Sequence, residues 1–168
     1  MNMRLHLFSR YSIIPLFHYS STLIPRMASR RRLARIAVMQ TLFEQDFLSS
    51  DDSTERQHFH GESALHRNID ELKASEVDVP FAENLLRGVE DHASDIRQAI
   101  IEHAPQWPLE RMDRITRALL LIGAYELLFA HEAPPAVIMN EAIDIAKEFG
   151  EEESGKFVNG VLNAIAHQ

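Results

Sequence analysis

The chain has 168 residues, of which 45% are hydrophobic and 25% charged; these values describe one folded soluble domain and exclude a chain that is disordered throughout. It contains no cysteine, which excludes disulfides, thiolate metal sites and a cysteine nucleophile, and favours a cytoplasmic location. The longest unbroken apolar stretch, residues 118–125, is far shorter than the roughly 20 residues of a membrane span, so we expect no membrane contact.

The net charge of −8 is distributed unevenly along the chain. No acidic residue precedes Glu44, whereas seven of the 17 basic residues do, so the rest of the chain holds 10 basic and 25 acidic residues. An acidic body with a basic N-terminal arm is typical of a protein that contacts a polyanion through one short segment.

Residues 1–27 carry arginines, serines and hydrophobic residues without helical periodicity, together with Pro15 and Pro25. Two interpretations remain open: an organellar targeting segment, or a start assigned upstream of a true start at Met27. In either case we expect a disordered leader that stays outside the fold. The predicted organisation is therefore a leader over residues 1–27 and one folded domain over residues 28–168.

The helical pattern begins after Ser29, which suits an N-cap. A first helix is predicted to end near Leu48, with small and aliphatic side chains at helical spacing forming its buried stripe. The polar segment 49–61 is predicted to be a loop, and a shorter amphipathic helix follows at about residues 62–74.

A long helix is predicted from Pro80 to about His103, because Asp78 suits its N-cap and apolar residues recur at steps of three or four. The next helix, centred on RITRALLLIGAYELLF, is apolar almost all round and is predicted to lie in the middle of a bundle. Two more helices are predicted near residues 135–149 and 154–166. The sequence thus predicts an all-α bundle of six or seven helices.

No set of residues converges on a reaction. Lys156 follows a glycine, but the earlier glycine of a phosphate loop is missing and three glutamates precede the pair. His58 and His60 lie in the polar loop without metal partners at ligand spacing, and His92 falls on an apolar helix face, where core histidines are common. We therefore expect no catalysis, no metal and no cofactor.

Arg30, Arg31, Arg32 and Arg35 stand at the beginning of the first predicted helix. Guanidinium groups bind phosphates in bidentate geometry, and the free N–H groups of a helix N-terminus also favour anions. Cations at this end oppose the helix dipole, at a cost of about a few tenths of a kcal/mol each. Because the cluster is locally unfavourable, it predicts a nucleic-acid partner; the alternative is an ordinary exposed helix start.

Arg32, Arg35, Met39 and Phe43 are expected to share a side of this helix that faces away from the buried stripe. An exposed phenylalanine beside arginines can stack an unpaired base of single-stranded RNA. Two interpretations of Phe43 remain open, base stacking and packing in the core.

Five segments of the chain occur in an order and spacing that match one known family. They are SRRRLARIAVMQTLFEQ at residues 29–45, FAENLLRGV at 81–89, AYEL at 124–127, MNEAIDIAKEFG at 139–150 and KFVNGVL at 156–162. In these segments the chain resembles the NusB family of transcription antitermination factors, over residues 29–166. The resemblance implies an all-α fold of two three-helix halves. It also implies binding of single-stranded boxA-like RNA together with ribosomal protein S10 (NusE), within the transcription elongation complex that makes ribosomal RNA.

The resemblance further implies an RNA-binding side and a partner-binding side. The RNA-binding residues implied are Arg30, Arg31, Arg32, Arg35, Phe43, Lys156 and Phe157. Lys156 has an alternative as a solvated charge at a helix end, and Phe157 as a core residue. The NusE-facing region implied is residues 110–117, with Glu110, Arg114 and Arg117 as its candidate contacts.

The chain departs from the family in two places. The central helix carries Leu121 where the family usually has a basic residue, and residues 110–117 match only in general character. An exposed Leu121 would favour burial in a partner. Two rival functions remain: a purely protein-binding module, and the NusB-like domain of an rRNA cytosine methyltransferase, whose catalytic domain is not within these 168 residues.

Overall fold

The described part of the chain is built from helices. The computed structural model describes residues 29–49, 59–72 and 76–168, and within these ranges it contains no strand. The helices of this part are α1 (Arg30–Ser49), α2 (Gly61–Glu71), α3 (Val79–Asp91), α4 (Ala93–His103), α5 (Arg114–Tyr125), α6 (Pro135–Phe149) and α7 (Ser154–Ala166). A 3₁₀ turn η4 (Leu109–Arg111) precedes α5, and a π-helical turn η5 (Glu126–Ala130) follows it. The predicted all-α fold is confirmed, whereas the leader and His58 lie outside the described residues.

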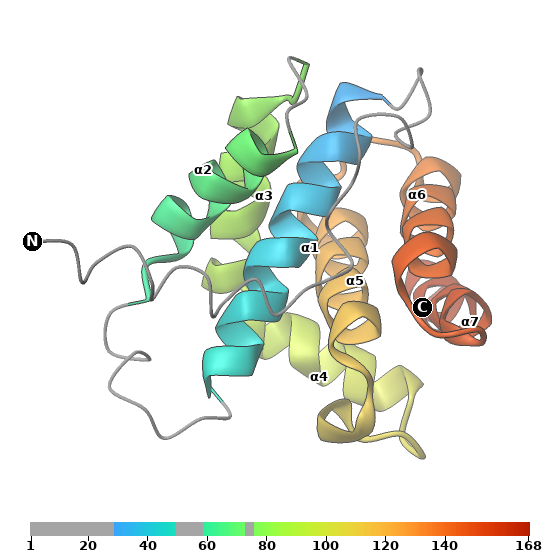
Figure 1. The fold of residues 1–168 in the computed structure, drawn as a ribbon. Helices are drawn as coiled ribbons and strands as arrows, with labels where there is room; N and C mark the ends of the chain where they lie inside the picture. Colours follow the sequence, from blue (N-terminus) through green and yellow to red (C-terminus); the bar gives the residue numbers. More distant parts are fainter. Residues whose placement is uncertain (1–28, 50–58, 73–75) are drawn as a thin grey trace, which may run out of the picture.

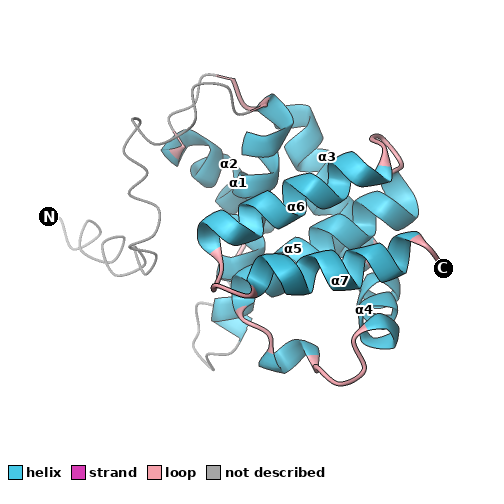
Figure 2. Cartoon of the chain, turned by 90° about the vertical axis from the view of Figure 1, so that its right-hand side faces the viewer, coloured by secondary structure: helices cyan, strands magenta, loops and turns pink. Residues whose placement is uncertain are grey.

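Helix α5 lies at the centre of the bundle, between α1 on one side and the α6–α7 pair on the other (Figure 1). Helices α1, α2 and α3 pack on one another, while α6 and α7 run side by side and both pack on α5 (Figure 2). Helix α4 follows α3 and contacts α5 and α7. In the part of the chain described, no helix is long and apolar enough to cross a membrane.

The composition of α5 explains its central position. Leu119 and Leu120 are 0% exposed and Ile122 is 1% exposed, because neighbours cover this helix on all sides. Gly123 allows α7 to come close, since a Cβ at this position would lie 2.6 Å from Cδ1 of Leu162. The sequence-based prediction of a central helix is confirmed.

Side-chain caps fix where three helices begin. The Oγ of Ser29 accepts a hydrogen bond from the backbone N–H of Arg32 at 3.0 Å, and Asp78 Oδ1 accepts one from Phe81 at 3.2 Å. Both were predicted as N-caps. Asp113, which was not, accepts the backbone N–H of Thr116 at 2.9 Å and begins α5. Each cap contributes about 1 kcal/mol to helix stability.

The long helix predicted from Pro80 to His103 is wrong, because the chain changes direction at His92 and forms α3 and α4 instead. The His92 ring lies 4.2 Å from the ring of Phe129, centroid to centroid, and its Nδ1 lies 2.9 Å from the backbone oxygen of Gly88. The bend brings Ile96 and Ile100, both 0% exposed, into the core beneath α5 and α7.

The exposed position predicted for Met39 is also wrong. Met39 is 0% exposed, because α1 packs against α2 and α3 on one side and against α5 on the other. Leu121, which on an exposed face would have favoured a partner, is 8% exposed and belongs to the core of the bundle. The burial of Leu121 within the chain removes the reason for assigning it to a partner.

Candidate nucleic-acid interface

The first turns of α1 carry the four arginines that the sequence singles out. Cations at a helix N-terminus oppose its dipole, and acidic side chains from other parts of the fold offset this effect. Arg31, Arg32 and Arg35 each form an ion pair. Arg30 is exposed and forms no ion pair with the described residues.

Arg31 lies between two carboxylates and an aromatic ring. Its Nη2 is 3.1 Å from Oε2 of Glu132, and its Nε is 3.7 Å from Oδ2 of Asp78. Its guanidinium carbon lies 4.6 Å from the centroid of the Phe81 ring. The side chain is still 43% exposed, so an anion can reach its outer edge.

Arg32 joins α1 to α6. Its Nη2 donates a hydrogen bond to Oε2 of Glu148 at 3.0 Å, and its Nη1 lies 3.5 Å from Oε2 of Glu141. Burial raises the pKa of the Glu148 carboxyl above its usual range. The arginine side chain is only 16% exposed, so a phosphate would have to displace these carboxylates to bind it.

Arg35 is buried, contrary to the expected exposed position. It donates two hydrogen bonds to the carboxylate of Glu126, one from Nε at 2.8 Å and one from Nη2 at 2.6 Å. Both side chains are less than 5% exposed, and Phe81 covers the guanidinium at 5.1 Å. Because its donors face Glu126 and solvent does not reach it, Arg35 is unsuited to contact a phosphate.

Phe43 lies one helical turn before Phe47 on α1, near the start of α5. Its ring is partly buried and packs against the core, so part of it remains accessible. The guanidinium carbon of Arg114 lies 5.2 Å from the centroid of the Phe47 ring. Aromatic rings and a cation therefore lie together at this end of α1.

The residues singled out in the partner-facing region differ in exposure. Arg117 is 15% exposed; it donates hydrogen bonds to Oδ1 of Asp46 at 2.7 Å and to the backbone oxygen of Met112 at 2.9 Å. Arg114 is 38% exposed, and its Nε lies 3.2 Å from Oδ2 of Asp46. Glu110 is exposed on η4. Arg117 thus fixes α5 to α1, whereas Glu110 and Arg114 remain accessible to a partner.

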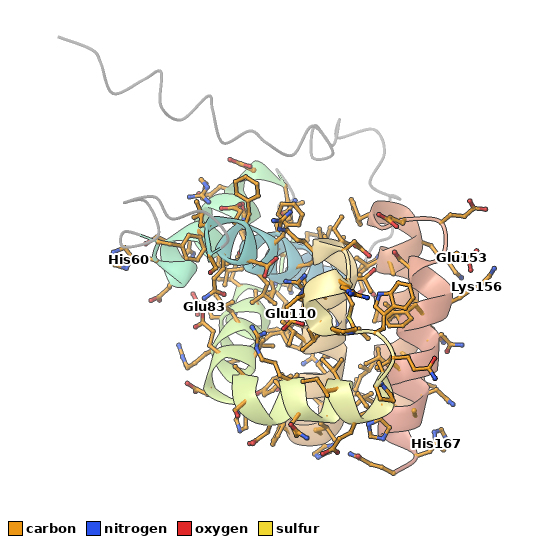
Figure 3. All side chains as sticks on the ribbon, turned by 90° about the horizontal axis from the view of Figure 1, so that it is seen from below. His60, Glu83, Glu110, Glu153, Lys156 and His167 are labelled. Carbon is orange, nitrogen blue, oxygen red and sulfur yellow. The ribbon has the colours of Figure 1, made fainter. Side chains whose placement is uncertain are left out.

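Lys156 and Phe157 stand in the first turn of α7. The Lys156 side chain is 79% exposed, and its Nζ donates a hydrogen bond to Oε1 of Glu153 at 2.9 Å. Both of these side chains point away from the bundle (Figure 3). Phe157 is partly buried, and the ring of Trp107 lies 6.1 Å from it, centroid to centroid.

A hydroxyl network holds the start of α7 against the start of α5. The Oγ of Ser154 accepts hydrogen bonds from Thr116 Oγ1 at 2.9 Å and from the backbone N–H of Glu151 at 3.0 Å. It lies 3.4 Å from Oδ2 of Asp113, to which it donates. Lys156 and Phe157 therefore lie near the N-terminal end of α5. The other end of α5 leads into η5, whose first residue, Glu126, is the ion-pair partner of Arg35.

The candidate RNA residues thus form two groups along α1. Arg32 and Asp46 are separated by 14 positions, which corresponds to about 21 Å of α-helix. The arginines lie at one end, and Phe43 with the Arg114 region lies toward the other. A ligand that contacts both groups has to extend along the helix.

Histidines and carboxylates build no metal site in the part of the chain that is described, because no three of them are grouped to hold an ion. His60 is exposed at the start of α2, and His92 packs against aromatic rings.

Sequence reasoning missed two residues that matter here. Glu126 gave a usable signal, since it is a single acid within the apolar run that ends at Ala130, and such an acid needs a buried cation. Trp107 gave none, because it stands in a segment that was predicted only to break a helix.

The fold and these surfaces define a class: small all-α proteins whose accessible cations and aromatic rings line a helical bundle. The chain belongs to the NusB family, whose model matches residues 32–167. This match confirms the family resemblance inferred from the five sequence segments.

Individual relatives agree with this assignment. The chain is 38% identical over 135 residues to the transcription antitermination protein NusB of Desulfitobacterium hafniense, covering 80% of this chain and 86% of that protein. The structure of T. maritima NusB superposes with a TM-score of 0.69 at 35% identity, covering 84% of this chain and 94% of that one. A crystal structure of the antitermination factors NusB and NusE in complex with dsRNA superposes with a TM-score of 0.69 at 25% identity, covering 83% and 98%.

Proposed function

We propose that this chain is a non-enzymatic transcription antitermination factor that binds boxA-like single-stranded RNA together with ribosomal protein S10 (NusE). The observation that carries the proposal is the similarity, over 83% of the chain, to a NusB that was crystallised with NusE and dsRNA. That similarity supports a partner NusE and an RNA ligand, whereas the preference for a single strand is taken from the family resemblance of the sequence. The transcription elongation complex in the cytoplasm is then its place of action.

The proposed RNA surface is narrower than the one expected from sequence. Arg30 and the outer edge of Arg31 contact phosphates, because these two guanidinium groups are accessible. Arg32 contributes by exchanging the carboxylate of Glu148 for a phosphate. Arg35 is left out, because it is buried.

Aromatic contacts supply the second part of the surface. Phe43 and Phe157 are both partly buried, so each has a ring face or edge that a base can cover. Lys156, 79% exposed, adds a cation next to Phe157. Phosphate contacts set affinity and base contacts set sequence preference.

NusE is proposed to bind near the start of α5, where Glu110 and Arg114 are accessible. Arg117 supports this surface from inside, through its hydrogen bonds to Asp46 and Met112. The partner then lies toward the end of α1 that carries Phe43, so that both proteins can contact one strand.

The test measures the fluorescence anisotropy of a labelled boxA-like single strand with the full chain, with and without NusE. We expect weak binding alone, tighter binding with NusE, and weaker binding of a scrambled strand and of a duplex. Affinity is expected to fall as salt is raised from about 50 to 200 mM. Equal affinity with and without NusE at matched salt would contradict a shared site.

The rival function, a module that binds proteins only, makes a different forecast in this assay. If the chain binds proteins only, NusE or another protein binds while RNA fails to bind at either salt concentration. Arg30→Ala then has no effect on the RNA anisotropy, whereas in our proposal this substitution lowers the affinity for all RNA sequences alike.

A further inference from the structure

Trp107 is the largest exposed aromatic side chain in the described part of the protein and has no role in the sites above. It is 54% exposed, in the loop between α4 and η4. Its ring lies 6.1 Å from the ring of Phe157 at an interplanar angle of 52°. The two rings thus form a continuous aromatic patch that joins this loop to the start of α7.

The backbone around Trp107 is restrained in the absence of a ligand. Pro105 and Pro108 restrict the backbone on both sides, and the backbone N–H of Trp107 donates to the oxygen of Ala104 at 3.0 Å. Two positions after Trp107, Leu109 is 4% exposed and anchors the end of this loop in the core. Little backbone freedom of this loop remains to be lost on binding, so a contact with the indole retains more of its affinity.

The size of the patch fits a single base better than a protein. A tryptophan side chain offers roughly 150–250 Å² of surface, so an indole that is 54% exposed presents on the order of 100 Å². A stable protein interface needs about 800 Å² on each partner. The other large exposed hydrophobics among the described residues, Ile101 and Val137, lie on α4 and α6.

The charges around the patch point to the face of a base and not to a phosphate. Glu110 and Glu153 are exposed on the segments that carry the two rings, and Glu153 holds Lys156. Arg111 is the other exposed cation nearby in sequence. Exposed carboxylates outnumber these cations, because Glu151 and Glu152 precede Glu153 and are exposed as well. Attraction for a phosphate is therefore weak here, whereas stacking on an aromatic ring requires no charge.

We infer that Trp107 is a base-stacking platform that, next to Phe157, holds one unpaired base of the bound RNA strand. The inference rests on the proposed function, because it assumes that Phe157 belongs to the RNA surface. It adds an RNA contact in the loop between α4 and η4, which none of the sites above includes.

The chain contains one tryptophan, so fluorescence excited at a wavelength that tyrosine does not absorb reports on Trp107 alone. We expect a boxA-like single strand to quench the emission of the full chain with the same concentration dependence as the anisotropy of the labelled RNA. Trp107→Ala is expected to weaken binding by about 5- to 160-fold and to leave the salt slope unchanged. Ile101→Ala, at a residue of similar exposure, is the matched control and is expected to bind like the unaltered protein.

The outcomes separate the two proposals. If anisotropy shows RNA binding but the emission stays constant and Trp107→Ala binds normally, the platform is wrong and the proposed function stands. If Trp107→Ala weakens NusE binding alone, the patch is a protein contact and the inference is also wrong. Absence of RNA binding by anisotropy, with and without NusE, removes the proposed function itself. Because quenching is measured on the unaltered chain, a poorly folded variant does not obscure the result.

Discussion

Glu126→Gln is expected to destabilise the fold strongly and to leave the phosphate contacts of the RNA intact. The substitution keeps the shape of the side chain but removes the charge opposite Arg35. This arginine is 3% exposed and donates hydrogen bonds to both oxygens of the Glu126 carboxylate. Breaking a buried ion pair by removing one partner costs about 3–5 kcal/mol, since the other charge stays buried without compensation. For a domain of this size the melting temperature should fall by roughly 10 °C or more.

Urea unfolding followed by circular dichroism measures the loss directly, and Glu132→Gln provides the control. Glu132 pairs with Arg31, but its side chain is 49% exposed and that of Arg31 is 43% exposed. Exposed pairs contribute only about 0–1 kcal/mol. The two variants remove the same charge from the same region, so a difference between them reports on burial.

The reasoning fails if Glu126→Gln and Glu132→Gln lower the free energy of unfolding equally. It also fails if Arg35→Ala keeps full stability while the slope of log affinity against log salt decreases by about 0.7, the value for one lost phosphate contact to a single strand. That result would mean that Arg35 leaves the core and binds RNA, as the sequence alone predicted.

Three further results are expected. Glu148→Gln should release Arg32 and tighten RNA binding severalfold in the anisotropy assay. The control Glu62→Gln, at an exposed residue outside the site, should leave RNA binding unchanged. Weaker RNA binding by Glu148→Gln would show that Glu148 positions the arginine. Phe43→Ala should cost about 1–3 kcal/mol of RNA binding with an unchanged salt slope, and an effect on melting temperature alone would assign Phe43 to the core. Burial, opposed by Arg67, raises the pKa of Glu44 above its usual range, so the charged form is disfavoured in the fold. The contribution of Glu44 to folding stability is therefore fully present below the pKa of Glu44 in the unfolded chain, and it is lost as the pH rises through the pKa of Glu44 in the folded protein. Glu44→Gln should flatten this part of the pH–stability curve.

Local sequence patterns predicted the helices because each depends on residues close in the chain. The caps Ser29 and Asp78 and the proline that begins α6 act within one helical turn, so a reader of the sequence can find them. The bend at His92 was not predicted, because apolar residues keep helical spacing across it and His92 itself is partly buried. Periodicity reports which side chains are buried but not whether the axis continues straight.

The candidate site was harder to predict than the fold. The four arginines look alike in sequence, yet they range from buried to exposed because the partners of the covered ones come from distant segments. Glu126 is 91 positions from Arg35, and Glu148 is 116 positions from Arg32. The packing of α1 against α5, together with the ion pairs between Arg32 and α6, decides which guanidinium groups remain accessible to an external anion.

The pairing of α1 with α5 fixes more than the position of two side chains. Two ion pairs connect the antiparallel helices at separate points. Arg35 of α1 pairs with Glu126 just beyond the C-terminal end of α5, and Asp46 of α1 pairs with Arg117 near the N-terminal end of α5. Sliding either helix by one turn, about 5.4 Å, would break both ion pairs together. The two ion pairs therefore fix the register of α1 against α5, and with it the spacing between the end that carries Arg30 and the end that carries Arg114.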